Sequence, residues 1–323
     1  MAIYPAEKQN VAAAADQIKS GGVVAFPTET VYGLGADALN ASAVAQIFEI
    51  KNRPHFDPLI VHIADFKELD KIAEVNDLAL MLAKKFWPGS LTLVLKKKNN
   101  IPDLVTSGLS TVAVRMPNHP VALELIRLAE TPIAAPSANP FGYLSPTTAK
   151  HVHDQLGDKV SIILDGGPCV TGVESTILDL ASSKPAILRV GGIPIEEIEK
   201  VVGPLEFRKA GASPSAPGQL EQHYAPRKRL KVLEREQILN HPNLDAGGVL
   251  FFSNPLILKA KKVKTLSVRG DLKEAAANLF SFLHDFDDSD CAFILAESVP
   301  ETGLGSAIMD RLRKASAGSA SAH

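Results

Sequence analysis

The sequence predicts an α/β protein with a twisted, mixed sheet and a second, smaller α/β domain. Short apolar runs alternate with amphipathic helical segments, which favours this class over an all-β fold or a helix bundle. Two pairs of neighbouring strand-like runs have no helical segment between them, so we expect a mixed sheet rather than a purely parallel one. The chain of 323 residues is also long enough for two ordinary domains.

The elements of the larger domain follow from the spacing of apolar residues. Residues 7–20 form an alanine-rich helix, and Gly21 and Gly22 end it because glycine readily stops a helix. Further helices are expected where apolar residues recur at helical spacing, and strands where short runs are continuously apolar. The expected helices are residues 43–51, 78–87 and 119–130. The expected strands are residues 23–26, 58–63, 91–96, 111–117, 131–138, 161–167, 175–180 and 186–191.

The composition changes near Phe207, where a stretch rich in Pro, Gly, Ser and Ala begins. This stretch has no apolar periodicity, which is typical of a linker. Beyond it, short apolar runs again alternate with helical segments and predict a small Rossmann-like domain. The expected strands there are residues 230–234, 247–253 and 291–298, and the expected helices are residues 234–241 and 271–287. We therefore predict a larger α/β domain (1–206), a linker (207–228), a small α/β domain (229–314) and a disordered low-complexity tail (315–323).

Composition limits the compartment and the partners. Apolar residues make up 46% of the chain and charged residues 22%, which is normal for a globular protein with a sizeable core. A net charge of -2 does not indicate a nucleic-acid-binding protein, although it is compatible with a local basic patch. The two cysteines form neither a disulfide framework nor a zinc cluster. With no secretory signal and no apolar run of membrane-spanning length, we expect a cytoplasmic protein.

The stretch VVAFPTETVYGLGADA contains a pattern that resembles a dinucleotide-binding fingerprint. GLGADA fits G-x-G-x-x-A, and Asp57 follows at about the right distance for a ribose-binding acid. In that fingerprint the first glycine follows the strand directly, whereas PTETVY separates Phe26 from Gly33 here. We therefore favour another interpretation, in which the polar residues of PTETVY form the rim of a binding site. The glycines would only let the chain turn.

Lys51 and Arg53 follow the helix at 43–51, and Pro54 biases Arg53 toward an extended backbone. In an extended segment these two cations point to one side, where they are able to clamp a triphosphate. A solvated helix end is the alternative, because cations also complement the helix dipole there.

Other polar residues stand at strand ends. Ser137 and Asn139 follow the run PIAA, and Glu174 and Ser175 begin another strand. No G-x-S-x-G motif surrounds Ser137, which disfavours a nucleophilic hydrolase. The sequence contains no H-E-x-x-H metal motif and no Walker A motif. His62 lies within an apolar run, where a core histidine is the simplest interpretation.

Taken in order, these motifs resemble one family. PTETVYGLGAD, KNRPHFDPLIVHI, FWPGSLTLVL, STVAVRMPNH, APSANPFGYLSPT and GVESTILDL with ILRVGG are similar to the YrdC-like family. The linker APGQLEQHYAP and the second domain resemble its two-domain threonylcarbamoyl-AMP synthases. The resemblance implies a twisted YrdC-like sheet with a broad concave positive surface. It also implies synthesis of threonylcarbamoyl-AMP and pyrophosphate from L-threonine, bicarbonate and ATP with Mg²⁺. Separate proteins then transfer the threonylcarbamoyl group to tRNA. The resemblance leaves open whether this chain itself contacts tRNA.

The resemblance also implies roles for individual residues but assigns no metal ligands. The K-x-R and S-x-N signature gives the expected catalytic residues Lys51, Arg53, Ser137 and Asn139. The expected threonine pocket is Thr30, His62, Arg115, Ala135 and Ser175. The expected ATP contacts are Arg53, Asp57, Thr111, Ser137, Ser145, Arg189, His223 and Tyr224. Asp57 stands where relatives often carry Asn, and Ala216 precedes the linker's Pro-Gly pair where relatives carry Ser.

These residue types suit the implied chemistry. Arg115 offers the planar fork that a carboxylate prefers, and hydroxyl or imidazole groups suit a threonine hydroxyl. Two alternatives remain. One is an RNA-binding or ribosome-associated module that uses the concave basic surface. The other is a YrdC-like carbamoyl-handling enzyme of the kind found in longer chains with zinc-finger and acylphosphatase modules.

Overall fold

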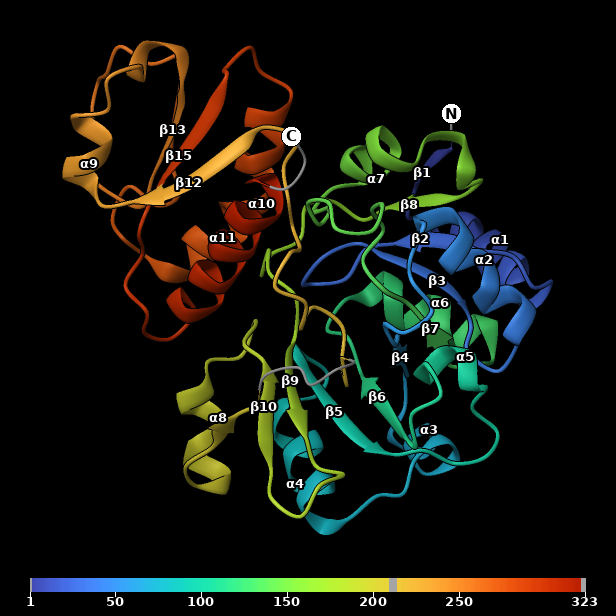
Figure 1. The fold of residues 1–323 in the computed structure, drawn as a ribbon. Coiled ribbons are helices and arrows are strands. Elements are labelled where there is room, and N and C mark those ends of the chain that lie inside the picture. Colours follow the sequence, from blue (N-terminus) through green and yellow to red (C-terminus); the bar gives the residue numbers. More distant parts are fainter. Residues whose placement is uncertain (1, 209–213, 321–323) are drawn as a thin grey trace.

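The computed structural model describes residues 2–208 and 214–320 and places them in two α/β units (Figure 1). Within these residues the larger unit contains an eleven-stranded sheet and the smaller one a four-stranded sheet. The strands of the large sheet, in spatial order, are β1 (Ile3–Pro5), β8 (Ile163–Asp165), β2 (Val24–Phe26), β3 (Gly33–Asp37), β7 (Ile133–Ala134), β4 (Ile60–His62), β6 (Thr111–Arg115), β5 (Leu91–Lys96), β9 (Thr176–Asp179), β10 (Ala186–Arg189) and β11 (Glu206–Phe207). Parallel and antiparallel pairs both occur, so the expected mixed sheet is confirmed.

Helices pack on the large sheet. α1 and α6 pack on each other and on β2, β7 and β8 through small and branched side chains. The other helices contribute to the main core, with α2, α3 and α4 supplying many of its apolar residues. The helices of this unit are α1 (Lys8–Lys19), α2 (Ala41–Lys51), α3 (Phe66–Ile72), α4 (Asp77–Phe86), α5 (Asp103–Thr106), α6 (Pro120–Ala129), α7 (Ala149–Leu156), the 3₁₀ helix η1 (Gly157–Lys159) and α8 (Ile195–Val202).

The alternation of side chains along β4 and β6 decides which of them reach the site. Val61 points into the main core, whereas its neighbours Ile60 and His62 point to the opposite face of the sheet. Ala113 and Arg115 of β6 lie beside them in register. Ala216 of the linker packs in one cluster with Ile60 and Ala113, so the linker covers a face of the sheet that carries both apolar and polar side chains.

The smaller unit is a parallel sheet with helices (Figure 1). Its strands, in spatial order, are β12 (Arg229–Leu233), β15 (Phe293–Glu297), β13 (Gly248–Phe251) and β14 (Lys262–Thr265). Its helices are α9 (Arg235–Leu239), the 3₁₀ helix η2 (Leu244–Ala246), α10 (Leu272–Asp287) and α11 (Gly305–Ala320). α10 and α11 pack on each other, and their apolar core also includes Val31, Leu144 and Val173 of the larger unit. The two units thus share a hydrophobic core.

We expected the glycines of GLGAD to let the chain turn, and this prediction is wrong. They lie in the strand β3, which pairs antiparallel with β2. Close packing explains the difference. A Cβ on Gly35 would lie 2.6 Å from the ring of Phe26 and 2.7 Å from Ile133. Glycine is therefore required because neighbouring side chains occupy the space, not because of an unusual backbone angle.

The expected disordered tail is also wrong for residues 315–320, which form the last turns of α11. Ala315 is fully buried, and Ser319 accepts a hydrogen bond from the main-chain nitrogen of Leu230 at 3.0 Å. Alanine and serine repeats have a low-complexity composition, but alanine is also the best helix former. The end of the tail, 321–323, lies outside the described residues. In the described part of the chain, no helix is long and apolar enough to cross a membrane.

Candidate active site

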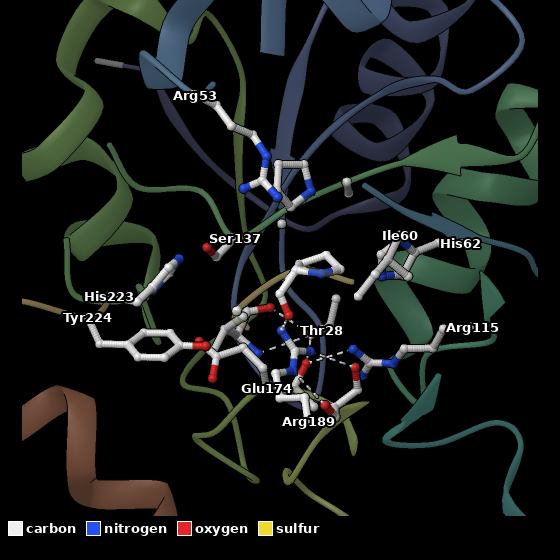
Figure 2. A pocket seen from close by; sticks show the side chains of 18 residues that line it. Thr28, Arg53, Ile60, His62, Arg115, Ser137, Glu174, Arg189, His223 and Tyr224 are labelled. Carbon is white, nitrogen blue, oxygen red and sulfur yellow. Dashed lines mark hydrogen bonds between the residues drawn. The ribbon is translucent and has the colours of Figure 1, made fainter. Parts of the chain in front are cut away.

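A pocket lies where the large sheet, the loop after β7 and the linker meet (Figure 2). Many residues expected at the site line it together: Thr30, Arg53, His62, Arg115, Ala135, Ser137, Ser175, Arg189, His223 and Tyr224. They come from positions between 30 and 224. The fold therefore brings together side chains that are far apart in the sequence of the larger unit, and adds others from the linker.

On one side of the pocket, Arg115 is held by Glu29. The Arg115 Nη2 group donates to Glu29 Oε1 at 2.5 Å, and both side chains are buried. Arg115 Nη1 also donates to Thr30 Oγ1 at 2.9 Å, which in turn lies 2.8 Å from Thr28 Oγ1. Burial raises the pKa of Glu29, but the charge and hydrogen bond of Arg115 outweigh it and hold that pKa below its ordinary value. The result is a fixed guanidinium beside two hydroxyl groups.

His62 lies on the same side of the pocket and is neutral. Its ring is buried, and this burial, followed by the nearby charge of Arg115, lowers its pKa to about 3. The ring packs edge-on against Phe26, with 6.2 Å between centroids. A neutral imidazole is able both to donate and to accept a hydrogen bond, which suits a hydroxyl group.

Arg53 lies on another wall and is paired with Asp57. Arg53 Nη2 lies 2.9 Å from Asp57 Oδ2 and forms an ion pair with it. Neither carboxylate oxygen of Asp57 accepts a hydrogen bond. The hydrogen bonds of Arg53 go to main-chain oxygens of Asp57 and Pro58. Burial raises the pKa of Asp57, and burial also lowers the pKa of Arg53. Asp57 is fully buried and lies behind Arg53 rather than in the pocket lining.

The serine and asparagine of the S-x-N signature differ in position. Ser137 lines the pocket, whereas Asn139 is buried and donates to the main-chain oxygens of Pro140 and Tyr143, both at 2.9 Å. Lys51 also lies behind the lining, where it donates to the main-chain oxygens of Ser137 and Asn139. Asn139 and Lys51 therefore support the loop that carries Ser137.

Ser175 and Arg189 form a third wall. Arg189 Nε donates to the main-chain oxygen of Ser175 at 3.0 Å, and its Nη2 donates to Ser175 Oγ at 3.1 Å. Strand β10 has an irregular register between Ile187 and Arg189. Such an irregularity re-aims a side chain, and here Leu188 and the adjacent Arg189 both reach the face covered by the linker.

The linker closes the pocket from the side of the smaller unit. Pro217, Gly218, His223 and Tyr224 all line it. Arg189 Nη1 donates to the main-chain oxygen of Pro217 at 3.1 Å. Burial, followed by the charge of Arg53, lowers the pKa of His223 well below its ordinary value, so this ring is neutral.

Besides Asp57, two further expected nucleotide contacts lie apart from the lining. Thr111 begins β6 and pairs with Lys96 in the sheet, and Ser145 is buried with its hydroxyl on Glu174 Oε1 at 2.5 Å. The lining also includes residues to which the resemblance gave no role: Thr28, Val31, Gly33, Ile60, Pro136, Glu174, Pro217 and Gly218. The sequence marks Thr28 and Glu174 only as polar residues next to the end or the start of an expected strand.

Metal binding has little support from protein side chains alone. Within the described ranges, no group of three or more His, Cys, Asp or Glu residues is arranged to hold a metal ion. Asp57 is the candidate carboxylate near the cationic wall, and both its oxygens lack a hydrogen-bond partner. Mg²⁺ often uses one or two protein carboxylates together with substrate phosphates, but Asp57 is fully buried and paired with Arg53 in this structure.

The fold and the pocket define the class: a two-domain α/β enzyme whose mixed, YrdC-like sheet carries a cation-lined pocket closed by a linker. Residues 16–191 match a family model described as telomere recombination, and residues 193–317 match one described as threonylcarbamoyl-AMP synthase, C-terminal domain. The chain belongs to the two-domain threonylcarbamoyl-AMP synthase family.

Individual relatives agree with this assignment. The threonylcarbamoyl-AMP synthases of Pyrococcus abyssi and Bacillus subtilis are each 46% identical, with 96% and 95% of this chain covered and 95% and 93% of theirs. A solved structure of P. abyssi Sua5 complexed with L-threonine has a TM-score of 0.91 at 45% identity, and the match covers 98% of this chain and 97% of that one. E. coli YciO has a TM-score of 0.52 at 25% identity, covering 57% of this chain and 90% of its own. The expected YrdC-like fold is thereby confirmed.

Proposed function

We propose that this protein makes threonylcarbamoyl-AMP and pyrophosphate from L-threonine, bicarbonate and ATP, for the threonylcarbamoyladenosine modification of tRNA. The observation that carries the proposal is the pocket itself, which holds two kinds of surface. Arg115 with Thr30 and His62 suits a hydroxylated amino acid, and Arg53 with Arg189 suits an anion. The near full-length likeness to named synthases supports the same function.

L-Threonine is proposed to bind with its carboxylate on the Arg115 side of the pocket. Glu29 neutralises much of the charge of Arg115 but also fixes the guanidinium plane, which orients the remaining donors. The substrate hydroxyl then meets the hydroxyl of Thr30, Thr28 or Ser175, or the neutral ring of His62. Buried polar groups of this kind would be left unpaired by valine, which disfavours its binding.

ATP is proposed to enter as its magnesium complex on the side of Arg53 and Arg189. The threonine amine attacks bicarbonate, which loses water, or attacks the CO2 that bicarbonate yields on losing hydroxide, in which case the nitrogen releases a proton to solvent. An oxygen of the resulting carbamate then attacks the α-phosphorus. Pyrophosphate leaves with the electrons of the broken P–O bond. Cationic side chains stabilise negative charge that develops on phosphate, and no covalent enzyme intermediate is required. The linker residues His223 and Tyr224 would exclude water from the labile carbamate.

The partners follow from this reaction. Its product must pass to proteins that transfer the threonylcarbamoyl group to tRNA, and such a system belongs in the cytoplasm. Direct contact with tRNA is a separate part of the proposal. The sequence has two basic runs, at 96–98 and 227–229, which are candidates for contact with RNA phosphates, but each has a cation paired within the protein. Lys97 pairs with Asp103, and Arg227 pairs with Asp287 at 3.2 Å.

The test is pyrophosphate release by the purified chain with all three substrates and with each left out in turn. We expect release that requires L-threonine, bicarbonate and ATP together, and a product with the mass of threonylcarbamoyl-AMP. Release that does not depend on threonine, alongside tight RNA binding, would instead favour the RNA-binding module. A gel-shift titration with unmodified tRNA tests direct contact separately.

A further inference from the structure

Helix α11 of the smaller unit contacts the linker along one of its faces. Arg311, Lys314 and Gly318 follow one another at spacings of three and four residues, so they share that face. Lys314 Nζ donates to the main-chain oxygen of Gly218 at 2.7 Å. Gly318 packs so closely on the linker that an added Cβ would lie 2.8 Å from the Cβ of Ala225. The linker is therefore held at both ends of the segment that lines the pocket.

Arg311 is the largest fully buried side chain among the described residues. Its Nε donates to Glu174 Oε2 at 2.7 Å, and its Nη2 donates to the main-chain oxygen of Val190 at 3.0 Å. Both acceptors belong to the larger unit, whereas Nη1 donates to Asp310 of its own helix at 2.5 Å. One guanidinium thus joins the two units with directed hydrogen bonds.

Glu174 pairs with Arg311 and also lines the pocket, so it connects Arg311 with the pocket wall. Its Oε2 accepts from Arg311, its Oε1 accepts from Ser145 Oγ at 2.5 Å, and its side chain is part of the pocket lining. Burial raises the pKa of Glu174, but the charges of Arg311 and then Arg189 outweigh it and hold the pKa below its ordinary value. Without Arg311, a buried carboxylate would face the pocket with part of its compensating charge removed.

Tyr224 provides an independent observation. The guanidinium carbon of Arg311 lies 5.0 Å from the centroid of the Tyr224 ring, and Phe280 of α10 lies at 5.6 Å from it. Tyr224 has a φ of 61°, in the left-handed region that a bulky side chain rarely adopts. Such a conformation persists only where the surroundings determine it. Arg311 and Phe280 of the smaller unit are part of those surroundings.

We infer that Arg311 is a positioning residue of the active site, through which α11 fixes Glu174 and Tyr224 and thereby sets the linker over the pocket. This inference deepens the proposed function and rests on it. It gives the smaller unit a defined task, which is to hold the linker in its closed position. Arg311 does not line the pocket, so its effect on the reaction passes through the residues that it orients.

The test compares Arg311→Met with Arg313→Met. Arg313 lies on the same helix, and its exposed guanidinium pairs with Glu301. We expect Arg311→Met to lower kcat/KM for L-threonine and ATP by about a hundredfold, as a misplacement of about 1 Å does in other sites. The rise in KM should exceed the fall in kcat, and Arg311→Lys should restore part of the loss. Arg313→Met should leave both constants unchanged.

A second readout does not depend on activity. A broad-specificity protease should cut within residues 214–226 faster in Arg311→Met than in the unmodified protein or in Arg313→Met, with the cut sites mapped by mass spectrometry. Lys314→Met, which removes the donor to Gly218, should change cleavage in the same direction. This variant keeps the test decisive if Arg311→Met does not fold.

The outcomes separate the inference from the proposed function. Unchanged KM values and unchanged linker cleavage in a folded Arg311→Met protein would overturn the inference, as would equal changes in Arg313→Met. If Arg311→Met does not fold, unchanged linker cleavage in Lys314→Met overturns it. If the unmodified protein shows no threonine-dependent pyrophosphate release, the proposed function fails while the cleavage experiment still reports whether α11 holds the linker.

Discussion

Lys51 donates a hydrogen bond to the main-chain oxygen of Ser137 at 2.6 Å and thereby connects the end of α2 to the loop after β7. It also donates to the main-chain oxygen of Asn139. Lys51 is only 1% exposed, and burial, followed by the charge of Arg53, lowers its pKa well below the ordinary value. The lysine of the K-x-R signature thus holds the S-x-N loop from behind in this structure.

Substitution of Lys51 by Met tests this link. The carbonyl groups of Ser137 and Asn139 would lose their donor, at a cost of about 1–3 kcal/mol for each group that stays unsatisfied. We expect a folded but less stable protein in which Ser137 is misplaced, with kcat/KM for ATP lower by about a hundredfold. Thermal unfolding and pyrophosphate release measure the two effects. Lys150→Met is the control, because Lys150 is exposed and pairs with Asp154. Full activity of Lys51→Met would contradict the role.

The pair formed by Arg53 and Asp57 leads to a second prediction. Asp57 compensates the charge of Arg53 in a buried setting, so Asp57→Asn should leave a stronger cation facing the pocket. We expect a lower KM for ATP together with a free energy of unfolding reduced by about 3 kcal/mol without ATP. ATP titration and urea unfolding measure both, with Asp103→Asn as an exposed control. Weaker ATP binding by Asp57→Asn would show instead that this carboxylate serves the nucleotide or its Mg²⁺.

Sequence reasoning predicted much of the pocket because its residues lie in short motifs. Thr30, Arg115 and Arg189 each lie on or beside an apolar strand, and such a strand has a clear pattern. The motif order then identified the family, which supplied roles that no spacing alone would have shown. The strands and helices expected in the larger unit were found for the same reason.

Long-range packing could not be predicted in this way. The contact between Glu174 and Arg311 joins positions 137 residues apart, and nothing near either residue marks the other. Gly35 resembled a turn residue in the sequence. The ring of Phe26 excludes a side chain at position 35, but this contact exists only because β2 and β3 pair in the fold. Tertiary contact, rather than local preference, decided both features.

The pH dependence of stability follows from His62. Its pKa is about 3 in the folded protein and about 6.5 in an unfolded chain, so unfolding takes up a proton below pH 6.5. The stability contributed by neutral His62 is complete above pH 6.5 and is lost as the pH falls toward 3. Between these values we expect a loss of about 1.4 kcal/mol per pH unit from this residue.

Urea unfolding at a series of pH values measures this loss. His62→Gln should reduce the slope between pH 6.5 and pH 4 by about one proton. An identical slope in His62→Gln would show that the ring is protonated in the folded protein. Near neutral pH, the pH–activity profiles of His62→Gln and of the unmodified protein should have the same shape, because the ring of His62 does not titrate there.

Substrate selection is a fourth prediction, and it needs no variant. Valine has the shape of threonine without the hydroxyl, so it leaves the polar groups of Thr30, His62 and Ser175 without their partner. We expect kcat/KM for valine to be lower than that for threonine by at least about a hundredfold. Serine keeps the hydroxyl and lacks one methyl group, so a loss of about 10- to 200-fold is expected. Pyrophosphate release with each amino acid measures the ratios, and equal use of valine would contradict a hydroxyl-binding pocket.

The last turns of α11 should contribute to stability, although their composition resembles that of a disordered tail. Ser316 Oγ donates to the main-chain oxygen of Leu230 and Ser319 Oγ accepts from its nitrogen, both at 3.0 Å, while Ala315 is fully buried. Removal of residues 315–323 should therefore lower the free energy of unfolding by about 2–3 kcal/mol, at about 1 kcal/mol for each lost hydrogen bond and the remainder from lost burial. Removal of residues 321–323 alone is the matched control. Because Gly318 packs on Ala225, the longer deletion should also raise KM for ATP, whereas equal stability and activity of the two deletions would contradict this role for the helix end.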